Sequence, residues 1–398
     1  MTDRFDPSRR DFLAVSALGL VGFASRARGL QVDAAMPDSE LLYVGTYTDN
    51  TKSEGIYLVR MTSSSGELRV IGTVKAGANP SFLAIHPNGR ALYAVNEVQE
   101  RSGKAAGGVS AFAIAADTGS LSRINEQSSE GAAPCYVSID RRGRAVLVAN
   151  YVGGTVALLP IQGVGALAAA KHVAQHRGTG PNKERQEAPH AHCVVPDPSN
   201  VYALAADLGI DRVLVYHMDL DAGALHEVGG AHLRPGAGPR HLTFHPSLPL
   251  VFVANELDST VTSLRFDAKS GALSALQTIS TLPAGWAGTN YPADIHFASS
   301  GRTLYVSNRG HNSIAVFSAA PGTGELALAQ TIPTGGDWPR NFSLDPTGKW
   351  LLVANQRSGN IVVFSRDSAT GTLATTAQRL AIPSPVCLRF RAHAGTTT

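Results

Sequence analysis

The chain has 398 residues, of which 43% are hydrophobic and 16% are charged. This balance excludes a disordered chain and predicts a large folded core, because disordered proteins are poorer in apolar residues. The formal net charge is only +3, and no run is rich in lysine or arginine, so we expect no nucleic-acid partner. Forty glycines against four methionines indicate many turns and few long helices.

The start of the chain has the pattern of an export signal. Ser8–Leu13 contains a twin arginine, Leu13–Ala24 is apolar, and Ser25–Ala27 is a small-residue cleavage site. The apolar run is about twelve residues, shorter than the roughly twenty that span a bilayer. We therefore predict a twin-arginine export signal and spacer over residues 1–34. The mature protein is expected to be periplasmic or secreted, with no membrane segment after cleavage of the signal.

The three cysteines, Cys135, Cys193 and Cys387, lack the paired spacing of a disulfide framework. Each lies in an apolar strand pattern, so we expect three small buried side chains, with one disulfide as the alternative in an oxidising compartment. No cysteine and histidine grouping has the spacing of a zinc site, and no loop resembles a calcium site. The sequence therefore predicts no metal and no cofactor.

A proline that opens a β-like run recurs seven times along the chain. The intervals between these prolines are 46 to 55 residues, a period typical of a repeated supersecondary unit. The prolines are Pro80, Pro134, Pro189, Pro239, Pro292, Pro339 and Pro385.

Two further signals recur with the same period. One is an apolar strand that usually ends in a polar residue, as in Ala91–Asn96 and Leu250–Asn255. A tight turn such as His86–Arg90 precedes it, in which proline fixes φ early and glycine supplies a positive φ later. The other is Gly-x-Leu at the close of a hairpin, as in Gly119–Leu121. Each unit therefore contains four short antiparallel strands.

Four-stranded antiparallel units repeated around an axis are the blades of a β-propeller. We predict an all-β fold in which residues 35–398 form a single domain of seven blades, with four antiparallel strands in each. The first strand, from Leu41, is of the second type in the unit, and the last, Pro385–Arg391, is of the first type. One blade should therefore be closed by the N- and C-terminal strands, which removes free sheet edges. An open solenoid is less favoured because it needs capping units that the sequence lacks.

Alternate connections in such a blade lie on the same face of the ring. The starts of the innermost strands and the ends of the second strands should therefore surround the mouth of the central channel. Ionisable residues at these positions cluster in the middle blades. Since a charge found in only some blades is not required by the blade, we predict a site formed by His190, His192, Asp207, Arg240, His241, Glu256, Arg309 and Arg340.

Residues 176–187 lengthen the connection before the fourth blade on the same face, and long connections are often functional. Gly178 and Gly180 would let this segment fold over the mouth and bring Arg185 to a ligand or to solvent. Each residue also has a structural interpretation: a single histidine at a strand start more often has a structural role. The asparagines that end most second strands are best explained by bonds to turn backbone.

Four segments carry a family resemblance: Gly180–His192, Gly238–His241, Ala254–Glu256 and Val306–Ile314. Through them the chain resembles the lactonase family of seven-bladed β-propellers, which includes propeller-type 6-phosphogluconolactonases and carboxy-muconate cyclases. The resemblance covers nearly all of the mature chain. It implies an active site on one face that contains His192, Arg240, Glu256 and Arg309, and no metal.

The predicted function is metal-independent hydrolysis of a sugar lactone to the free acid, similar to that of 6-phosphogluconolactonase in carbohydrate metabolism. His192 is the expected general base because imidazole titrates near neutral pH. Glu256 would orient that imidazole or act as the base itself. Arg240 and Arg309 would stabilise the oxyanion and hold a carboxylate or phosphate.

The remaining site residues, His190, Arg185, His241, Asp207 and Arg340, are predicted to bind a small anionic sugar lactone or a related acid. We expect a monomer. Two alternatives stay open: a muconate-type cycloisomerase that forms a lactone with the same groups, and a propeller that binds a ligand without catalysis. The sequence leaves open which lactone is the substrate.

Overall fold

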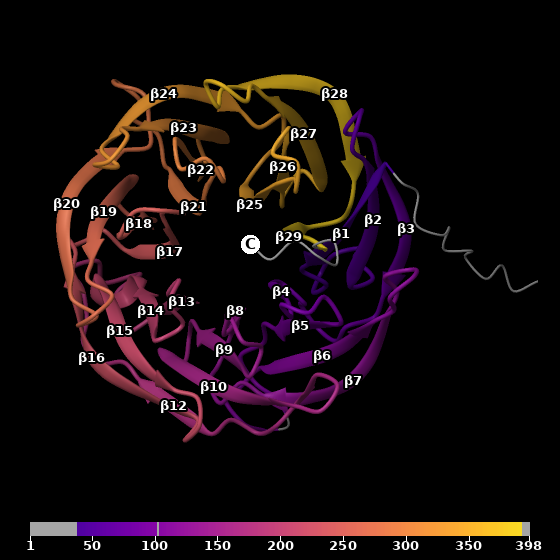
Figure 1. Cartoon of the computed structure of the whole chain (residues 1–398), viewed down its shortest axis with the longest axis vertical. Helices are drawn as coiled ribbons and strands as arrows, with labels where there is room; N and C mark the ends of the chain where they lie inside the picture. Colours follow the sequence, from indigo (N-terminus) through magenta and orange to yellow (C-terminus); the bar gives the residue numbers. More distant parts are fainter. Residues whose placement is uncertain (1–37, 102, 392–398) are drawn as a thin grey trace, which may run out of the picture. The chain divides into compact units, whose positions relative to one another are not determined.

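The computed structural model describes residues 38–101 and 103–391. They form seven antiparallel sheets that are arranged as the blades of a β-propeller (Figure 1). Within these ranges the only helical segment is the 3-10 turn η1 (Leu208–Ile210), and no helix there is long and apolar enough to cross a membrane. The all-β, seven-bladed prediction is confirmed. The predicted boundary at residues 34 and 35, and the export signal, lie outside the described residues.

The strands of each blade are given from the channel outward. Blade one contains β29 (Pro385–Phe390), β1 (Ser39–Thr46), β2 (Ile56–Thr62) and β3 (Leu68–Val74). Blade two contains β4 (Leu83–Ile85), β5 (Ala91–Asn96), β6 (Gly108–Ile114) and β7 (Leu121–Ser128). Blade three contains β8 (Pro134–Ile139), β9 (Ala145–Asn150) and β10 (Thr155–Gln162), with two short outer strands, β11 (Ala166–Leu167) and β12 (His172–Gln175), that both pair with β10.

The other four blades are regular. Blade four contains β13 (Ala191–Pro196), β14 (Tyr202–Asp207), β15 (Arg212–Asp219) and β16 (Ala224–His232). Blade five contains β17 (Pro239–Phe244), β18 (Leu250–Asn255), β19 (Thr260–Phe266) and β20 (Leu273–Ser280). Blade six contains β21 (Tyr291–Phe297), β22 (Thr303–Arg309), β23 (Ser313–Ala319) and β24 (Leu326–Pro333). Blade seven contains β25 (Pro339–Leu344), β26 (Trp350–Asn355), β27 (Asn360–Arg366) and β28 (Leu373–Ala381).

The ring closes in blade one, where the last strand of the chain joins the first. β29 pairs antiparallel with β1, with Leu42 opposite Phe390, and it contacts the innermost strands β25 and β4 of the neighbouring blades. Strands from the two ends of the described chain therefore lie side by side beside the channel (Figure 1). The predicted closure by N- and C-terminal strands is confirmed.

The second strands form the core between blades. β5, β9, β14 and β18 are buried along their whole length. A tyrosine from some of these strands also fixes a hairpin of the next blade: the Tyr43 hydroxyl donates to the Gly119 carbonyl at 2.7 Å, and the Tyr305 hydroxyl to that of Gly371 at 2.6 Å. Both glycines have positive φ, 73° and 77°. The Gly-x-Leu turn is thus both a hairpin and an inter-blade contact.

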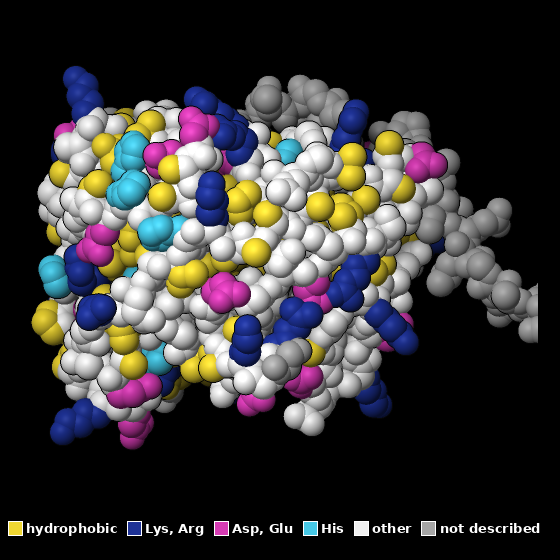
Figure 2. All heavy atoms as spheres, turned by 90° about the horizontal axis from the view of Figure 1, so that it is seen from below, with side chains coloured by type: hydrophobic (Ala, Val, Ile, Leu, Met, Phe, Trp, Pro, Cys, Tyr) yellow, Lys and Arg dark blue, Asp and Glu magenta, His cyan; other side chains and the backbone are white. Residues whose placement is uncertain are grey.

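The three cysteines are buried and free, and each lies on an innermost strand. The expectation of three small buried side chains is confirmed. On the side of the ring drawn in Figure 2, basic and acidic side chains are scattered over a mostly uncharged surface.

A β-bulge occurs near the start of the innermost strand in most blades. In blade five, for example, Pro239 pairs with Asn255 and His241 with Ala254, so Arg240 has no residue opposite it. Bulges of this kind turn a side chain away from the regular pleat. In blades one, three, four, five and seven the extra residue is, in that order, Val386, Cys135, His192, Arg240 and Arg340.

Candidate active site

The bulges deliver side chains from different blades into the central channel. Cys135, Arg240, Arg340 and Val386 together line a cavity inside it. Two residues predicted for the site, Arg240 and Arg340, therefore face the same space. Because each is the extra residue of a bulge, its direction is set by the backbone rather than by alternation along the strand.

Glu256 lies at the centre of an arginine cluster. Its Oε1 atom is 2.6 Å from Nη2 of Arg185, and its Oε2 atom is 2.6 Å from Nη2 of Arg309 and 2.9 Å from Nε of Arg240. The Arg240 contact is an ion pair without hydrogen-bond alignment, since Nε of Arg240 has no hydrogen-bond partner among the described residues. The structure thus brings together three of the four residues assigned to catalysis, together with Arg185 of the insertion.

The surroundings of Glu256 keep its carboxylate ionised. Burial raises the pKa of Glu256, but the charges of Arg309, Arg240 and Arg185 outweigh burial and lower it well below the usual range. Both oxygens are occupied by guanidinium groups. With no oxygen left free, this carboxylate is better suited to orienting the three arginines than to abstracting a proton.

Arg240 is almost fully buried, with 1% of its surface exposed. Its Nη1 atom donates to the carbonyl of Ala293 and to Nε2 of His241, the latter at 3.1 Å. Its Nη2 atom has no hydrogen-bond partner within the described chain and is not sealed from solvent. The guanidinium is therefore anchored on two sides and keeps one N–H edge open to the channel.

His241 is held by Asp294 on its other side. Nδ1 of His241 is 2.9 Å from Oδ1 of Asp294. Burial and then the charge of Arg240 lower the pKa of His241 to about 3, so the ring is neutral near pH 7. Because Arg240 can only donate, the network assigns the proton of His241 to Nδ1 and leaves Nε2 as the acceptor. His241 thus contacts Arg240 directly, in a positioning role.

His192 approaches the same cluster from blade four. Its ring centroid is 5.3 Å from that of His241. Burial and then the charge of Arg240 lower the pKa of His192 well below its usual range, so this imidazole is also neutral. Nε2 of His192 has no hydrogen-bond partner in the described part of the chain, and this atom is not completely buried.

Cys135 lies against the other ring nitrogen of His192. The sulfur is 3.6 Å from Nδ1 of His192 and 3.6 to 3.8 Å from the carbonyls of Ala149, Ala191 and His192. Burial raises the pKa of the Cys135 thiol, so the sulfur keeps its single proton. With three carbonyls available to accept that proton, the sulfur is best placed to accept from Nδ1–H. This tautomer leaves Nε2 of His192 free to take up a proton.

The insertion of residues 176–187 carries Arg185 to Glu256. Nη2 of Arg185 also donates to the Tyr151 hydroxyl at 3.2 Å, and the Arg185 side chain is 34% exposed. The Tyr151 ring stacks on His190, with 4.5 Å between ring centroids. His190 is therefore part of the wall beside Arg185, and its ring nitrogens contact the Tyr151 carbonyl and the Glu187 carboxylate.

Asp207 lies at the base of the insertion, where it holds backbone rather than arginines. Its Oδ1 atom accepts from the backbone N–H groups of His190 and Gly209, and its Oδ2 atom is 2.5 Å from Nδ1 of His176. Asp207 is completely buried. Both of its oxygens are thus engaged in the loop, and the structure does not bring this residue into the arginine cluster.

Arg309 is held by aromatic rings as well as by Glu256. Its Nε atom donates to the Tyr291 carbonyl at 3.1 Å, and its guanidinium carbon is 5.5 Å from the centroid of the Trp338 ring. The guanidinium carbon of Arg357 lies 3.4 Å from the centroid of the same Trp338 ring. Nη1 of Arg309 has no hydrogen-bond partner among the residues described. Like Arg240, Arg309 therefore presents one open N–H edge.

Arg340 lies over the Tyr47 ring, with 5.3 Å between its guanidinium carbon and the ring centroid. It shares the channel cavity with Glu97, whose Oε2 atom accepts from the hydroxyls of Tyr47 at 2.9 Å and Ser81 at 2.5 Å. Burial lowers the pKa of Arg340, but the combined effect of Tyr47, Glu97 and Glu256 is larger and raises it above the usual value. This arginine therefore stays charged.

Glu97 is one of the site residues that the sequence prediction missed. It follows Asn96 at the end of a second strand, as Glu256 follows Asn255. It is therefore an ionisable residue at a position on the rim where few blades carry a charge. Those were the criteria that selected Glu256. Asp294 was also missed, although it is an ionisable residue at the start of an innermost strand. Tyr291 and Trp338 were missed because their roles depend on side-chain contacts between blades that no local pattern reveals.

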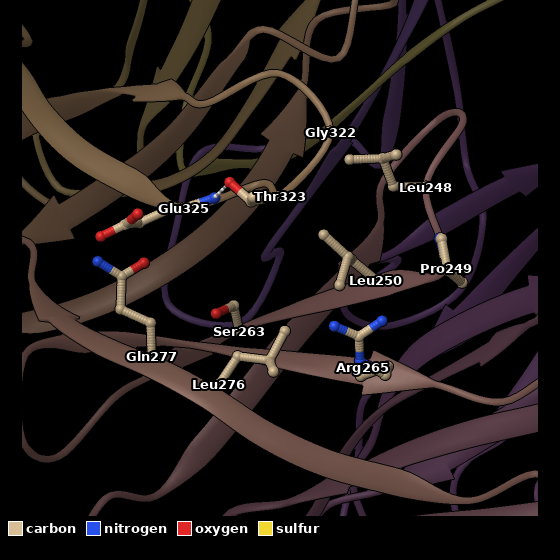
Figure 3. Close-up of a pocket in the computed structure, with 10 residues that line it drawn as sticks. All are labelled: Leu248, Pro249, Leu250, Ser263, Arg265, Leu276, Gln277, Gly322, Thr323 and Glu325. Atoms are coloured by element: carbon tan, nitrogen blue, oxygen red, sulfur yellow. Dashed lines mark hydrogen bonds between the residues drawn. The ribbon is translucent and has the colours of Figure 1, made fainter.

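Other hollows lie away from this cluster. One of about 340 Å³ is at the outer edge of blades five and six, where Leu250 and Leu276 lie opposite Gln277 and Glu325 (Figure 3). It offers no histidine or cysteine, and no pair of facing acids. Within residues 38–101 and 103–391, no three His, Cys, Asp or Glu side chains are grouped as metal ligands.

The fold and the cluster define a class: a seven-bladed propeller with an arginine-rich site at one mouth of its channel. The family model for lactonases with a 7-bladed beta-propeller matches residues 41–390, so the chain belongs to this lactonase family, as its sequence motifs indicated. A 6-phosphogluconolactonase of Bacillus subtilis is 38% identical over 348 residues, which are 87% of this chain and 97% of the relative.

Solved structures agree with this assignment. The periplasmic gluconolactonase of Pseudomonas aeruginosa has a TM-score of 0.84 and 34% sequence identity, covering 89% of this chain and 99% of that one. A second sequence relative, a 6-phosphogluconolactonase of Formosa agariphila, is 34% identical over 308 residues, 74% of this chain and 84% of the relative. The similarity therefore extends over the whole propeller.

Proposed function

We propose that this protein hydrolyses a sugar lactone to the free acid. The observation that supports this most directly is the set of open polar atoms at the channel mouth: Nη2 of Arg240, Nη1 of Arg309 and Nε2 of neutral His192. Lactone hydrolysis needs a proton acceptor for water and donors for an oxyanion. The names of the relatives, gluconolactonase and 6-phosphogluconolactonase, support the same reaction.

In the proposed mechanism, Nε2 of His192 takes a proton from water as the water oxygen bonds to the lactone carbonyl carbon. The carbonyl oxygen becomes an oxyanion, which Arg240 and Arg309 stabilise through their open N–H edges. The bond between that carbon and the ring oxygen then breaks, and the imidazolium of His192 returns its proton to the ring oxygen. The product is the open hydroxy acid. Glu256 keeps the guanidinium groups in place throughout.

The charge of the site favours a substrate or product with negative charge. The four arginines Arg185, Arg240, Arg309 and Arg340 outnumber the three carboxylates Glu256, Glu97 and Asp294, so the site carries one positive charge in excess. An acid product, or a phosphate on the sugar, would supply the missing negative charge. The site therefore suits a small anionic sugar lactone or its acid.

The test is a pH-stat assay of the purified protein with glucono-δ-lactone and with its 6-phosphate, each with and without a chelator. We expect hydrolysis that the chelator does not change. His192→Gln should lower kcat by about 10² to 10⁴. The control is His226→Gln, an exposed histidine on β16. A His192→Gln variant with the same kcat as this control would exclude His192 from the mechanism. If the protein instead converts a dicarboxylate into a lactone, the cyclase alternative is favoured.

We also propose that the protein is exported through a twin-arginine route to the periplasm or the exterior. The pattern at Ser8–Leu13 supports this, as does the periplasmic gluconolactonase among the relatives. Replacing both Arg9 and Arg10 with lysine should retain the protein in the cytoplasm of a host that has this route, as measured by cell fractionation.

A further inference from the structure

The channel cavity is small and is lined in part by polar groups. Its free volume is about 10 Å³, and Glu97, Arg240 and Arg340 contribute polar groups to its wall. A space of this size holds roughly one water molecule. A carboxylate or a phosphate needs more room, so neither group fits inside it.

Glu97 offers this cavity an acceptor. The hydroxyls of Tyr47 and Ser81 both donate to Oε2 and hold the carboxylate in one orientation. Oε1 has no hydrogen-bond partner in the part of the chain that the structure describes, and it is not completely buried. Glu97 also has no cation within ion-pair distance there. One of its oxygens is therefore open.

Arg240 and Arg340 offer the same cavity donors. Nη2 of Arg240 has no hydrogen-bond partner, and the Arg340 guanidinium makes no hydrogen bond or ion pair with any described residue. A hydroxyl oxygen can donate its proton to a carboxylate while it accepts from a guanidinium. A carbonyl or anionic oxygen cannot donate, and Glu97 would repel it.

We propose that this cavity binds one hydroxyl group of the sugar lactone, which donates to Glu97 and accepts from Arg340. The inference rests on the proposed function and identifies Glu97 as a residue that recognises a hydroxyl of the sugar. The charged group of a phosphorylated or acidic substrate then lies outside this cavity, towards Arg185 and Arg309. A lactone without the hydroxyl would leave buried polar groups unpaired, and sites of this kind reject such analogues strongly.

The experiment compares two lactones with the same six-membered ring, glucono-δ-lactone and the hydroxyl-free δ-valerolactone. We expect wild-type kcat/KM to favour glucono-δ-lactone by at least about 100-fold. In Glu97→Gln the amide would present a donor to a cavity already lined by donors, so the ratio of the two kcat/KM values should fall by about 10- to 100-fold. Glu100→Gln, an exposed glutamate on the same connection, is the matched control and should keep the wild-type ratio.

Different results overturn different statements. If Glu97→Gln slows both lactones equally, Glu97 acts in the chemistry or in the fold, and the hydroxyl site is wrong while the lactonase proposal stands. If the wild type hydrolyses neither lactone nor the 6-phosphate, the proposed function fails and takes this inference with it. If Glu97→Gln does not fold, the wild type is assayed with monodeoxy gluconolactones, each of which lacks one hydroxyl. We expect kcat/KM to fall by at least about tenfold for one of them relative to glucono-δ-lactone. Equal kcat/KM values for all of them would contradict the hydroxyl site.

Discussion

Glu97 and Glu256 follow the asparagines that end the second strands of blades two and five, and their carboxylates have opposite kinds of partner. Glu256 is held by three guanidinium groups, whereas Glu97 is held by two hydroxyls. The repeat places both on one rim, and the neighbouring blades decide what each can do. One carboxylate fixes cations, and the other keeps an oxygen for a ligand.

The first prediction concerns the stability that Glu256 confers. Glu256→Gln leaves Arg240 and Arg309 buried without their counter-charge, which should lower the free energy of unfolding by about 3 to 5 kcal/mol. Lactone hydrolysis should fall as well, because both guanidinium groups lose their common anchor. Urea unfolding and initial rates measure the two effects.

Glu100→Gln is again the control, since that residue is exposed and belongs to the same type of connection. Unfolding curves that coincide for Glu256→Gln and Glu100→Gln would show that the arginines do not need the carboxylate.

The second prediction is the pH dependence of this contribution. The folded-state pKa of Glu256 is depressed, so its stabilisation is fully present above the unfolded value of about 4.3 and is lost as pH falls through the folded value. Wild-type thermal stability should therefore decline below about pH 4.3, and the difference from Glu256→Gln should shrink in the same range.

Asp294 titrates in the same direction, because His296 and His241 lower its pKa against burial, so some acid sensitivity will remain in the variant. A gap between the two proteins that stays constant from pH 7 to pH 3 would contradict the assignment to Glu256.

The third prediction tests the contacts that orient Arg240. In Asp294→Asn the amide would donate to Nδ1 of His241 and move the ring proton to Nε2, which faces the N–H of Arg240. Two facing donors should displace the guanidinium, and kcat should fall on the order of 10² with a smaller change in KM.

His296→Gln is the control, because His296 contacts the other oxygen of Asp294 at 3.0 Å and does not reach Arg240. If both variants lose the same kcat, or if Asp294→Asn raises KM alone, the tautomer does not set the position of Arg240.

The fold was predictable because its signals are local and repeated. Proline, tight turn and Gly-x-Leu each act within a few residues, and strands such as β5 and β18 have the predicted ends, Ala91–Asn96 and Leu250–Asn255. Convergence on one face followed from antiparallel connectivity. It required no knowledge of distances.

The directions and contacts of the individual side chains were not predictable in the same way. A bulge adds one residue to a strand and turns Arg240 into the channel, but nothing in the spacing of Gly238–His241 reveals that shift. Asp207 illustrates the opposite case: it has the right position on the rim, yet the insertion uses both of its oxygens. Partners from other blades decide such roles.

The fourth prediction concerns Arg240 itself. Arg240→Met keeps much of the side-chain volume but removes the open N–H edge, so kcat should fall by about 10² to 10³, equivalent to roughly 3 to 4 kcal/mol of transition-state stabilisation. Arg265→Met is the control, because Arg265 lies on the outer edge of blade five beside the hollow of Figure 3. Unchanged turnover in Arg240→Met would exclude it as an oxyanion donor.

The fifth prediction concerns ring closure. A chain that ends at Ser384 lacks β29, and with it the buried Cys387 and Leu388 and the contacts of β29 with β1, β4 and β25. The loss of stability should exceed the roughly 2 to 5 kcal/mol of a single large-to-small core substitution, because a whole strand and two blade contacts are removed. A chain that ends at Arg391 keeps β29 and is the control in thermal and urea unfolding. If the shorter chain unfolds cooperatively at the same midpoint as the control, the ring does not depend on this strand, and the open edge of β1 must be stabilised in another way.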